Sequence, residues 1–245
     1  MRGPIVIGGN GHSGTRVFCN LVTLGGVFTG IEHVTRRSDS ADLRIISLLN
    51  RWVEPYLFDQ LSANDLERMR AAFRRRLLLY FPIRSIKWGF KNPRTMLILP
   101  FLDQILKDMK FIHVIRDGRD VSLGNPFVTN NRYVPAFLAS EERGLCPEEQ
   151  MILFWGRSNQ AAAEYGNQNM KDRYLQIRWE DLCREPLRQT EEICRFAECS
   201  KGNISELARV VRTPASLGRW KTYPDPQRRK VEETGRQWLQ QFGYV

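Results

Sequence analysis

The architecture of this chain can be read from one stretch, Ile5-Val6-Ile7-Gly8-Gly9-Asn10-Gly11-His12-Ser13-Gly14-Thr15-Arg16. Three β-branched residues run into a block that holds four glycines, and a helix-compatible segment continues to Leu24. This order predicts a strand, a tight loop and a helix. Such a loop directs several backbone N–H groups toward one point, and the positive end of the helix dipole adds to them. We therefore expect a phosphate-binding loop here.

The glycine pattern fits more than one known template. Gly9-x-Gly11-x-x-Gly14 matches the dinucleotide-binding fingerprint. Gly9 and Gly14 followed by Thr15-Arg16 match a nucleoside-triphosphate loop whose Lys and hydroxyl residue are replaced, which argues against ATP or GTP with magnesium. A glycine-rich turn without a ligand is a third interpretation. The stretch by itself leaves these alternatives open.

Length and composition limit the size of the fold and the kind of partner. The 245 residues are 42% hydrophobic, enough for one sizeable α/β domain or two small ones, and the net charge of +10 favours anionic partners. The basic residues are dispersed, which argues against nucleic acid, and the densest cluster, Arg74-Arg75-Arg76, is expected on a solvated helix face, with a polyanionic acceptor as the alternative.

Cysteine spacing and hydropathy indicate the compartment. The five cysteines show no C-x-x-C spacing, so we expect neither disulfides nor a metal site, and a reducing, cytoplasmic location. No apolar run reaches membrane-spanning length. A catalytic domain trimmed from a membrane-anchored protein is the alternative.

Two further strand ends carry cationic side chains. A short strand from Ile86 ends at Lys91, because Pro93 stops the ladder, and a buried strand from Lys110 to Ile115 runs into Arg116-Asp117-Gly118-Arg119-Asp120. Ligands of open α/β sheets lie beyond the carboxyl ends of strands, so Arg116 and Arg119 predict a second anion site and Lys91 a site residue. The alternative is a loop in which Asp117 and Asp120 neutralise both arginines. His113, inside the strand, is expected to be a packed core residue.

Strands that alternate with helices predict a single α/β domain over residues 1–245, with a mostly parallel sheet flanked by helices and a P-loop-like nucleotide-binding core. Asn64, with Glu67 three residues later, predicts a capping box at a helix start. The expected helices are Arg16–Leu24, Asp42–Val53, Asn64–Tyr80, Thr95–Leu106, Glu148–Gln168, Leu187–Glu198, Ser205–Val211 and Gln227–Phe242, and a fourth strand is expected at Tyr174–Arg178.

These motifs, in this order, resemble the sulfotransferases that use 3′-phosphoadenylyl sulfate (PAPS). His12-Ser13-Gly14-Thr15-Arg16 resembles their 5′-phosphosulfate loop, and Val114 to Asp120 resembles their 3′-phosphate motif. Four more segments are similar to elements of the same family: Lys91-Asn92-Pro93, Arg178-Trp179-Glu180-Asp181-Leu182, the late loop Gly218-Arg219-Trp220-Lys221 and the ending Phe242-Gly243-Tyr244.

The resemblance implies transfer of a sulfonyl group from PAPS to an acceptor hydroxyl, with release of 3′,5′-ADP and without a metal. Residues Ser13 to Arg16 would hold the 5′-phosphate, Lys91 would meet the sulfonyl or bridging oxygen, and Arg116 the 3′-phosphate. The family's general base is a Glu at about the position of Glu32, and His33 is the alternative base. A sugar, a phenol, a peptidyl tyrosine and a small natural product, anionic or not, all stay open as acceptors.

Three positions depart from the family pattern. His12 stands in the place of a Lys or Arg and is a weaker cation at neutral pH, unless bound phosphates raise its pKa. Gly124 stands where a Ser is expected as the second ligand of the 3′-phosphate. Val17 replaces an aromatic residue, so Trp179 or Trp220 is expected to stack on adenine.

Two other functional classes compete with this interpretation. A Rossmann-type NAD(P)-dependent oxidoreductase would use Glu32 on a ribose hydroxyl but leaves Lys91 and Arg116 without a role. A non-catalytic nucleotide-binding module would explain the departures at His12 and Gly124, and it would bind 3′,5′-ADP without turnover.

Overall fold

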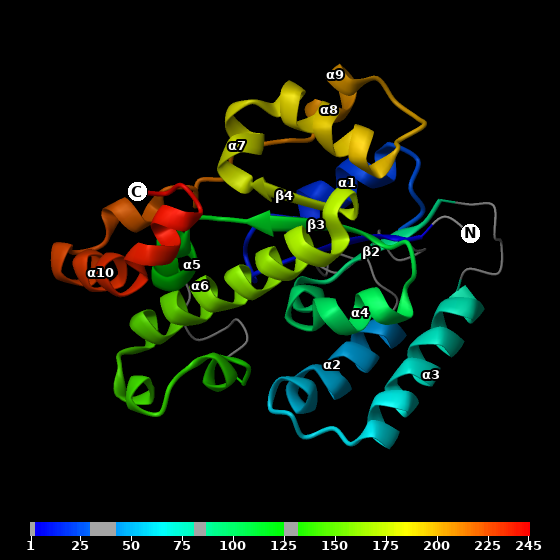
Figure 1. Cartoon of the computed structure of the whole chain (residues 1–245). Helices are drawn as coiled ribbons and strands as arrows, with labels where there is room; N and C mark the ends of the chain where they lie inside the picture. The colour runs from blue at the N-terminus through cyan, green and yellow to red at the C-terminus, as the bar shows by residue number, and fades with distance from the viewer. Residues whose placement is uncertain (1–2, 30–42, 81–86, 125–131) are drawn as a thin grey trace.

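A four-stranded parallel sheet forms the centre of the molecule. The structure, a computed structural model, describes residues 3–29, 43–80, 87–124 and 132–245 (Figure 1). The strand order is β2-β1-β3-β4, and the strands are β1 Ile5–Gly9, β2 Gly89–Lys91, β3 Lys110–Ile115 and β4 Tyr174–Arg178. Ile7 of β1 lies opposite Lys91 on one side and Ile112 on the other. The parallel α/β sheet expected from the sequence is confirmed, and it brings the ends of β1, β2 and β3 to one edge.

Helices cover both faces of the sheet. One face carries α1 Thr15–Leu24, α7 Trp179–Arg184, α8 Pro186–Ala197 and α9 Ile204–Ala208, and the larger core on the other face is built with α2 Leu43–Leu57, α3 Ala63–Tyr80, α4 Leu99–Ile105, α5 Gly118–Gly124, α6 Pro147–Tyr165 and α10 Asp225–Gln241 (Figure 1). None of the helices in the described ranges combines the length and the apolar character that a bilayer crossing requires.

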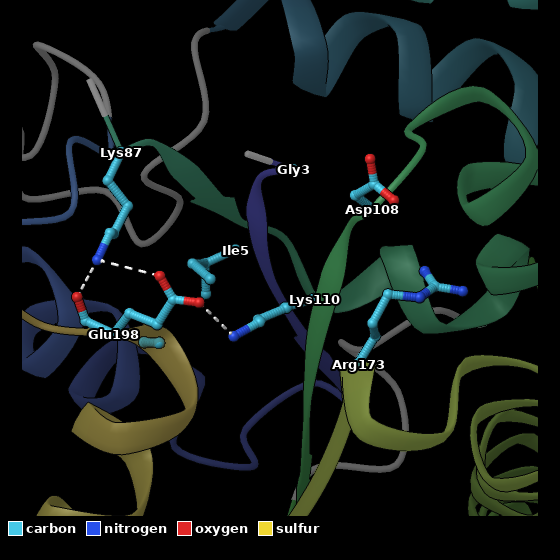
Figure 2. Close-up of a pocket in the computed structure, with 8 residues that line it drawn as sticks. Gly3, Ile5, Lys87, Asp108, Lys110, Arg173 and Glu198 are labelled. Carbon is cyan, nitrogen blue, oxygen red and sulfur yellow. Dashed lines mark hydrogen bonds and ion pairs between the residues drawn. The ribbon is translucent and has the colours of Figure 1, made fainter. Parts of the chain in front are cut away.

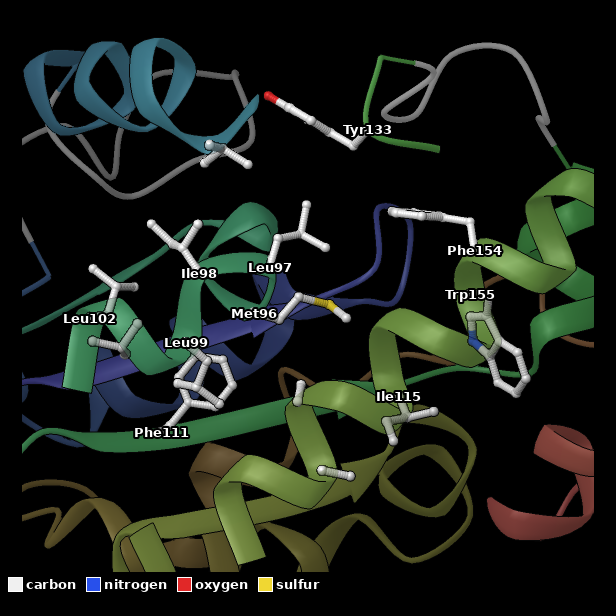
Figure 3. Close-up of a cluster of buried hydrophobic side chains, with 14 of the residues drawn as sticks. Met96, Leu97, Ile98, Leu99, Leu102, Phe111, Ile115, Tyr133, Phe154 and Trp155 are labelled. Atoms are coloured by element: carbon white, nitrogen blue, oxygen red, sulfur yellow. The ribbon is translucent and has the colours of Figure 1, made fainter. Parts of the chain in front are cut away.

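Alternation along the strands explains the two layers. Ile5 and Ile7 pack into the smaller core with α1 and α8, whereas Val6 between them packs into the larger core. Successive side chains of a strand point to opposite faces, so an uninterrupted apolar run belongs to a strand that is covered on both sides. In the larger core, Phe111 of β3 lies among Leu99 and Leu102, with Trp155 of α6 farther along the same layer (Figure 3).

Several polar side chains are enclosed within this core, among them His113. His113 of β3 is fully buried, and its Nδ1 lies 2.6 Å from the hydroxyl of Tyr174 and its Nε2 3.0 Å from Oδ1 of Asn159 on α6. Burial lowers the pKa of His113 from 6.5 to about 4, so the ring is neutral at pH 7. His113 is thus a core residue that ties β3 to β4 and α6.

Two local predictions are wrong. The single helix expected over 95–106 is instead a 3₁₀ helix, η2 Pro93–Ile98, followed by α4. Asn92 caps η2, since its side-chain oxygen accepts from the Arg94 N–H (3.0 Å), and Pro100, which has no N–H of its own, lies at the start of α4. The capping box of α3 is formed by Ser62 and Asp65, each accepting from the other's backbone N–H at 3.2 Å, and not by Asn64 and Glu67.

Candidate functional site

The glycine loop turns sharply from β1 into α1. Gly14 has φ 82, a left-handed conformation, and a Cβ at this position would lie 2.7 Å from the ring of Trp179. Glycine is required at 14 on both counts. The loop is held from below by α6, since the amide of Asn10 donates to the hydroxyl of Ser158 (3.2 Å).

The start of α1 has the properties of an anion site. The first N–H groups of a helix lack intrahelical partners, and the first turn of this 10-residue helix holds no acidic residue. Ser13 is 1% exposed, and its Oγ has no hydrogen-bond partner among the described residues. A buried hydroxyl without a partner is costly, and an anion at the helix start would satisfy it. The N–H of Ser13, which was expected to join the anion site, instead donates to the carbonyl of Asn10 (3.2 Å).

Arg116 joins three segments that are distant in the sequence. Its Nη1 donates to the carbonyl of His12 (3.0 Å), and its Nη2 donates to Oδ2 of Asp120 (2.9 Å) and to the carbonyl of Ser216. The side chain is 6% exposed, and its Nε has no partner among the residues described. The strand-end arginine and the glycine loop therefore contact each other, at the neighbouring ends of β3 and β1.

Asp120 holds the late loop, residues 213–221, against α5. Besides the bond from Arg116, its carboxylate accepts from the N–H groups of Gly218 (2.7 Å) and Trp220 (2.9 Å). A buried carboxylate with three donors is well satisfied. One side chain thus fixes both the arginine and the loop that was expected to close on a nucleotide.

Arg119 is engaged within the protein, contrary to its expected role as a nucleotide ligand. Its guanidinium forms a two-pronged bond to Asp117 (3.0 and 2.9 Å), donates to the carbonyl of Tyr244 (2.9 Å) and lies 3.8 Å from the ring centre of Trp220. Together with the Arg116–Asp120 pair, this buried pair matches the alternative in which Asp117 and Asp120 neutralise both arginines. Its contacts support the motif that presents Arg116.

The two tryptophans expected to stack on adenine lie in different surroundings. Trp179 is 2% exposed beneath Gly14 and packs against Phe18 at 6.0 Å between ring centres, so its ring supports the glycine loop and offers no face to adenine. Trp220 is half-buried in the late loop, with the Arg119 guanidinium over its ring. Stacking of Trp220 on adenine stays a prediction.

The remaining expected site residues are distributed as follows. Lys91 is 2% exposed at the end of β2, beside Ile7 of β1, and so lies at the same sheet edge as the glycine loop. Lys221, like Arg16, is exposed. Glu32 and His33 lie outside the described residues, so both assignments as general base stay predictions.

The imidazole of His12 lies in a positive environment. His12 itself has φ 64, and its side chain is partly exposed. Partial burial, followed by the positive charges of Arg116 and Arg219, lowers the pKa of His12 below its usual 6.5. At neutral pH the free protein therefore carries a neutral His12, and an anion in the site would raise its pKa.

Sequence reasoning missed a second layer of support behind the strand-end motif. The N–H of Asp117 donates to Glu180 (2.9 Å), and the hydroxyl of Tyr244 donates to the other oxygen of the same carboxylate (2.9 Å). Burial raises the pKa of Glu180. Trp155 of α6 donates to the carbonyl of Arg116 (3.0 Å). The segment Arg178 to Leu182 and the ending at Tyr244 were noticed only as resemblances, and they serve here to hold the motif in place.

A cavity at the opposite end of the sheet is also lined by cations. It measures about 390 Å³ and lies by the first residues of β1 and β3, with Lys87, Lys110 and Arg173 on its wall (Figure 2). Both lysines share Glu198, at 3.6 and 2.9 Å, and Arg173 binds Asp103 at 2.6 Å. Its positive charges are therefore balanced within the protein. Within the described ranges, no group of three His, Cys, Asp or Glu side chains is arranged to hold a metal ion.

Comparison with known proteins gives a family match. A family model described as "Sulfotransferase family" matches residues 4–201. A search of curated proteins found no match.

Solved structures resemble the fold. They include sulfotransferase STF9 from Mycobacterium avium (12% identity, TM-score 0.63, 100% of this chain and 78% of that one) and a sulfotransferase domain from the curacin biosynthetic pathway (14%, 0.58, 100% and 99%). A third is retinol dehydratase in a complex with retinol and PAP (12%, 0.51, 98% and 82%).

Proposed function

The chain belongs to the sulfotransferase family, and from this premise we propose that it transfers the sulfonyl group of PAPS to a hydroxyl of an acceptor and releases 3′,5′-ADP. The family match removes the support for a Rossmann-type oxidoreductase. Retinol dehydratase, which shares the fold, was crystallised with PAP, an abbreviation for the 3′,5′-diphosphate of adenosine, and this favours the same nucleotide here.

One observation carries the proposal. Arg116, at the end of β3, lies against the glycine loop at the end of β1, with Nη1 3.0 Å from the His12 carbonyl. A helix start and a buried arginine thereby provide two anion-binding elements in one site. A nucleotide with a phosphate at each end of its ribose suits two such elements, whereas a nucleotide with a single 5′-phosphate uses only one.

The chemistry assigns a role to each element. In sulfonyl transfer, charge spreads over the equatorial oxygens and builds on the departing 5′-phosphate, so catalysis is mainly positioning and electrostatic stabilisation, by analogy with phosphoryl transfer. The N–H groups at the start of α1, the Ser13 and Thr15 hydroxyls and Arg16 would hold the departing phosphate. Lys91 would neutralise the transferring group, and Glu32 would take the proton of the acceptor hydroxyl.

Calorimetry with three nucleotides tests the donor assignment. We expect 3′,5′-ADP to bind at least about 10-fold more tightly than 5′-AMP or NAD, since an additional hydrogen bond to a charged group contributes about 1.5–3 kcal/mol. Equal affinities would reject a dedicated 3′-phosphate pocket.

Turnover distinguishes an enzyme from a non-catalytic binding module. Radiolabelled PAPS with a panel of sugar, phenol and tyrosine-peptide acceptors should yield a labelled product, and Glu32→Gln should abolish it while 3′,5′-ADP affinity stays unchanged. Tight 3′,5′-ADP binding without product from any acceptor would favour the binding module.

A further inference from the structure

Gly124 lies against the side chain of an arginine from the late loop. It is the last residue of α5 and occupies the position where the related pattern has a serine. A Cβ built on Gly124 would lie 2.5 Å from Nη2 of Arg219 and 3.6 Å from its Cζ. The guanidinium therefore occupies the space into which a side chain at 124 would extend.

The backbone on either side of Arg219 is fixed, whereas its guanidinium is not. Asp120 accepts from the N–H groups of Gly218 (2.7 Å) and Trp220 (2.9 Å), the residues that flank Arg219. The Arg219 side chain is exposed and makes no hydrogen bond or ion pair with any residue in the described ranges. A guanidinium carries five N–H donors in a planar fork. The fixed backbone therefore positions a strong donor group that has no protein partner among the described residues.

The charge of Arg219 acts on the same space as that of Arg116. Both lower the pKa of His12, whose carbonyl accepts from Arg116 at 3.0 Å. Arg116 in turn shares Asp120 with the late loop. Arg116 is thus paired with a counter-ion, whereas Arg219 has none among the described residues, and a bound phosphate would supply one.

We infer that Arg219 and Gly124 are an exchanged pair, in which the guanidinium of Arg219 binds the 3′-phosphate in place of the hydroxyl that residue 124 lacks. The guanidinium occupies the space next to residue 124, with Nη2 2.5 Å from a Cβ built there. The inference rests on the proposed function and deepens it, since it makes the late loop a source of selectivity for the 3′-phosphate. A planar guanidinium that donates to two phosphate oxygens at once provides more hydrogen bonds than the single hydroxyl that it replaces.

A purely structural role for Arg219 predicts different behaviour. A cation near the carboxyl end of α5 would be favoured by the helix dipole, and its removal would change unfolding without changing the choice of nucleotide. Selectivity between nucleotides therefore separates the two roles.

The test compares nucleotide selectivity in Arg219→Met and Arg236→Met. Arg236 is exposed on α10, so its replacement is a matched loss of one surface charge. In calorimetry we expect Arg219→Met to weaken 3′,5′-ADP binding about 10- to 100-fold and 5′-AMP binding less than about 3-fold. Arg236→Met should change both affinities less than about 3-fold.

A second substitution tests the exchange itself. Gly124→Ser in the wild-type background places its Cβ against the guanidinium and should weaken 3′,5′-ADP binding, whereas the same change in Arg219→Met should strengthen it. Such a reversal of sign is a coupling between two sites in contact. Wild-type selectivity retained in Arg219→Met, or no gain from Gly124→Ser in that background, would overturn the inference alone. A wild-type protein that does not discriminate between the two nucleotides would overturn both the inference and the proposed function.

Discussion

Replacing Asp120 by asparagine should loosen the late loop and destabilise the whole domain. The buried carboxylate accepts from Arg116 (2.9 Å), Gly218 N–H (2.7 Å) and Trp220 N–H (2.9 Å). Asparagine has nearly the same shape, but one of its two terminal atoms is a donor, so at least one N–H would face another N–H. Arg116 would also be left as a buried charge without its counter-ion.

The size of the effect follows from this burial. Removing one partner of a buried ion pair costs about 3–5 kcal/mol, which corresponds to a fall in Tm of about 6–20 °C at ~2–4 °C per kcal/mol for a chain of this length. Urea unfolding would measure the loss of free energy. Hydrogen exchange of the 213–221 segment would report faster exchange at the N–H groups of Gly218 and Trp220.

The control is an exposed ion pair whose two residues are also four positions apart. Glu191 and Arg195 on α8 lie 3.1 Å apart, and both side chains are exposed, whereas those of Arg116 and Asp120 are buried. Glu191→Gln should cost no more than about 0.5 kcal/mol. If Asp120→Asn were as mild as Glu191→Gln, with unchanged exchange in the late loop, the clamp would have no energetic role.

Three other predictions concern the loop and its support. Because the pKa of His12 is lowered in the free protein and an anion would raise it, binding of 3′,5′-ADP should take up a proton near pH 6–7, seen as a buffer-dependent heat in calorimetry that disappears in His12→Gln. Gly14→Ala should lower the free energy of unfolding by about 2–4 kcal/mol, because the residue has φ 82 and its Cβ would meet Trp179. The control Gly144→Ala, with no atom within 4 Å of its Cβ, should lower it by less than about 1 kcal/mol, and similar losses for the two variants in urea unfolding would contradict this. Burial raises the pKa of Glu180, so the folded state binds the proton more tightly than the unfolded state, and stability should fall as pH rises from the ordinary carboxyl pKa through the raised one. Glu180→Gln should remove this pH dependence of the free energy of unfolding between pH 4.5 and 7, and an unchanged dependence would mean that another group causes it.

Much of the fold was predictable because its signals are local. The run Ile5 to Ile7 and the strand Lys110 to Ile115 are apolar on both sides, which requires a sheet covered on both faces. The prediction of one helix from residue 95 was wrong because the turn capped by Asn92 and the proline at 100 favour a 3₁₀ helix first. The apolar pattern of the segment does not distinguish these two kinds of helix.

The site was predictable where function depends on backbone position. Parallel strands place Gly9, Lys91 and Ile115 at one edge whatever the side-chain details, so the glycine loop and Arg116 could be assigned to one site. The position of Trp179 could not be predicted, since nothing in a linear pattern distinguishes a ring beneath a glycine from a ring that stacks on a ligand. For Arg119 the sequence offered both a ligand role and pairing with Asp117, and only the folded structure shows the pairing.

The amino-acid sequence by itself determined the glycine loop between a strand and a helix, the order of the strands along the chain and the positive strand ends, since each depends on residues within a few positions of one another. The tertiary structure alone decided the partners of those charges. Arg116 shares Asp120 with Gly218 and Trp220, about a hundred residues away, and Arg219 fills the space that Gly124 leaves. The physical reason is that burial and charge pairing depend on which groups the folded chain brings within a few ångströms, and sequence separation carries no record of that distance.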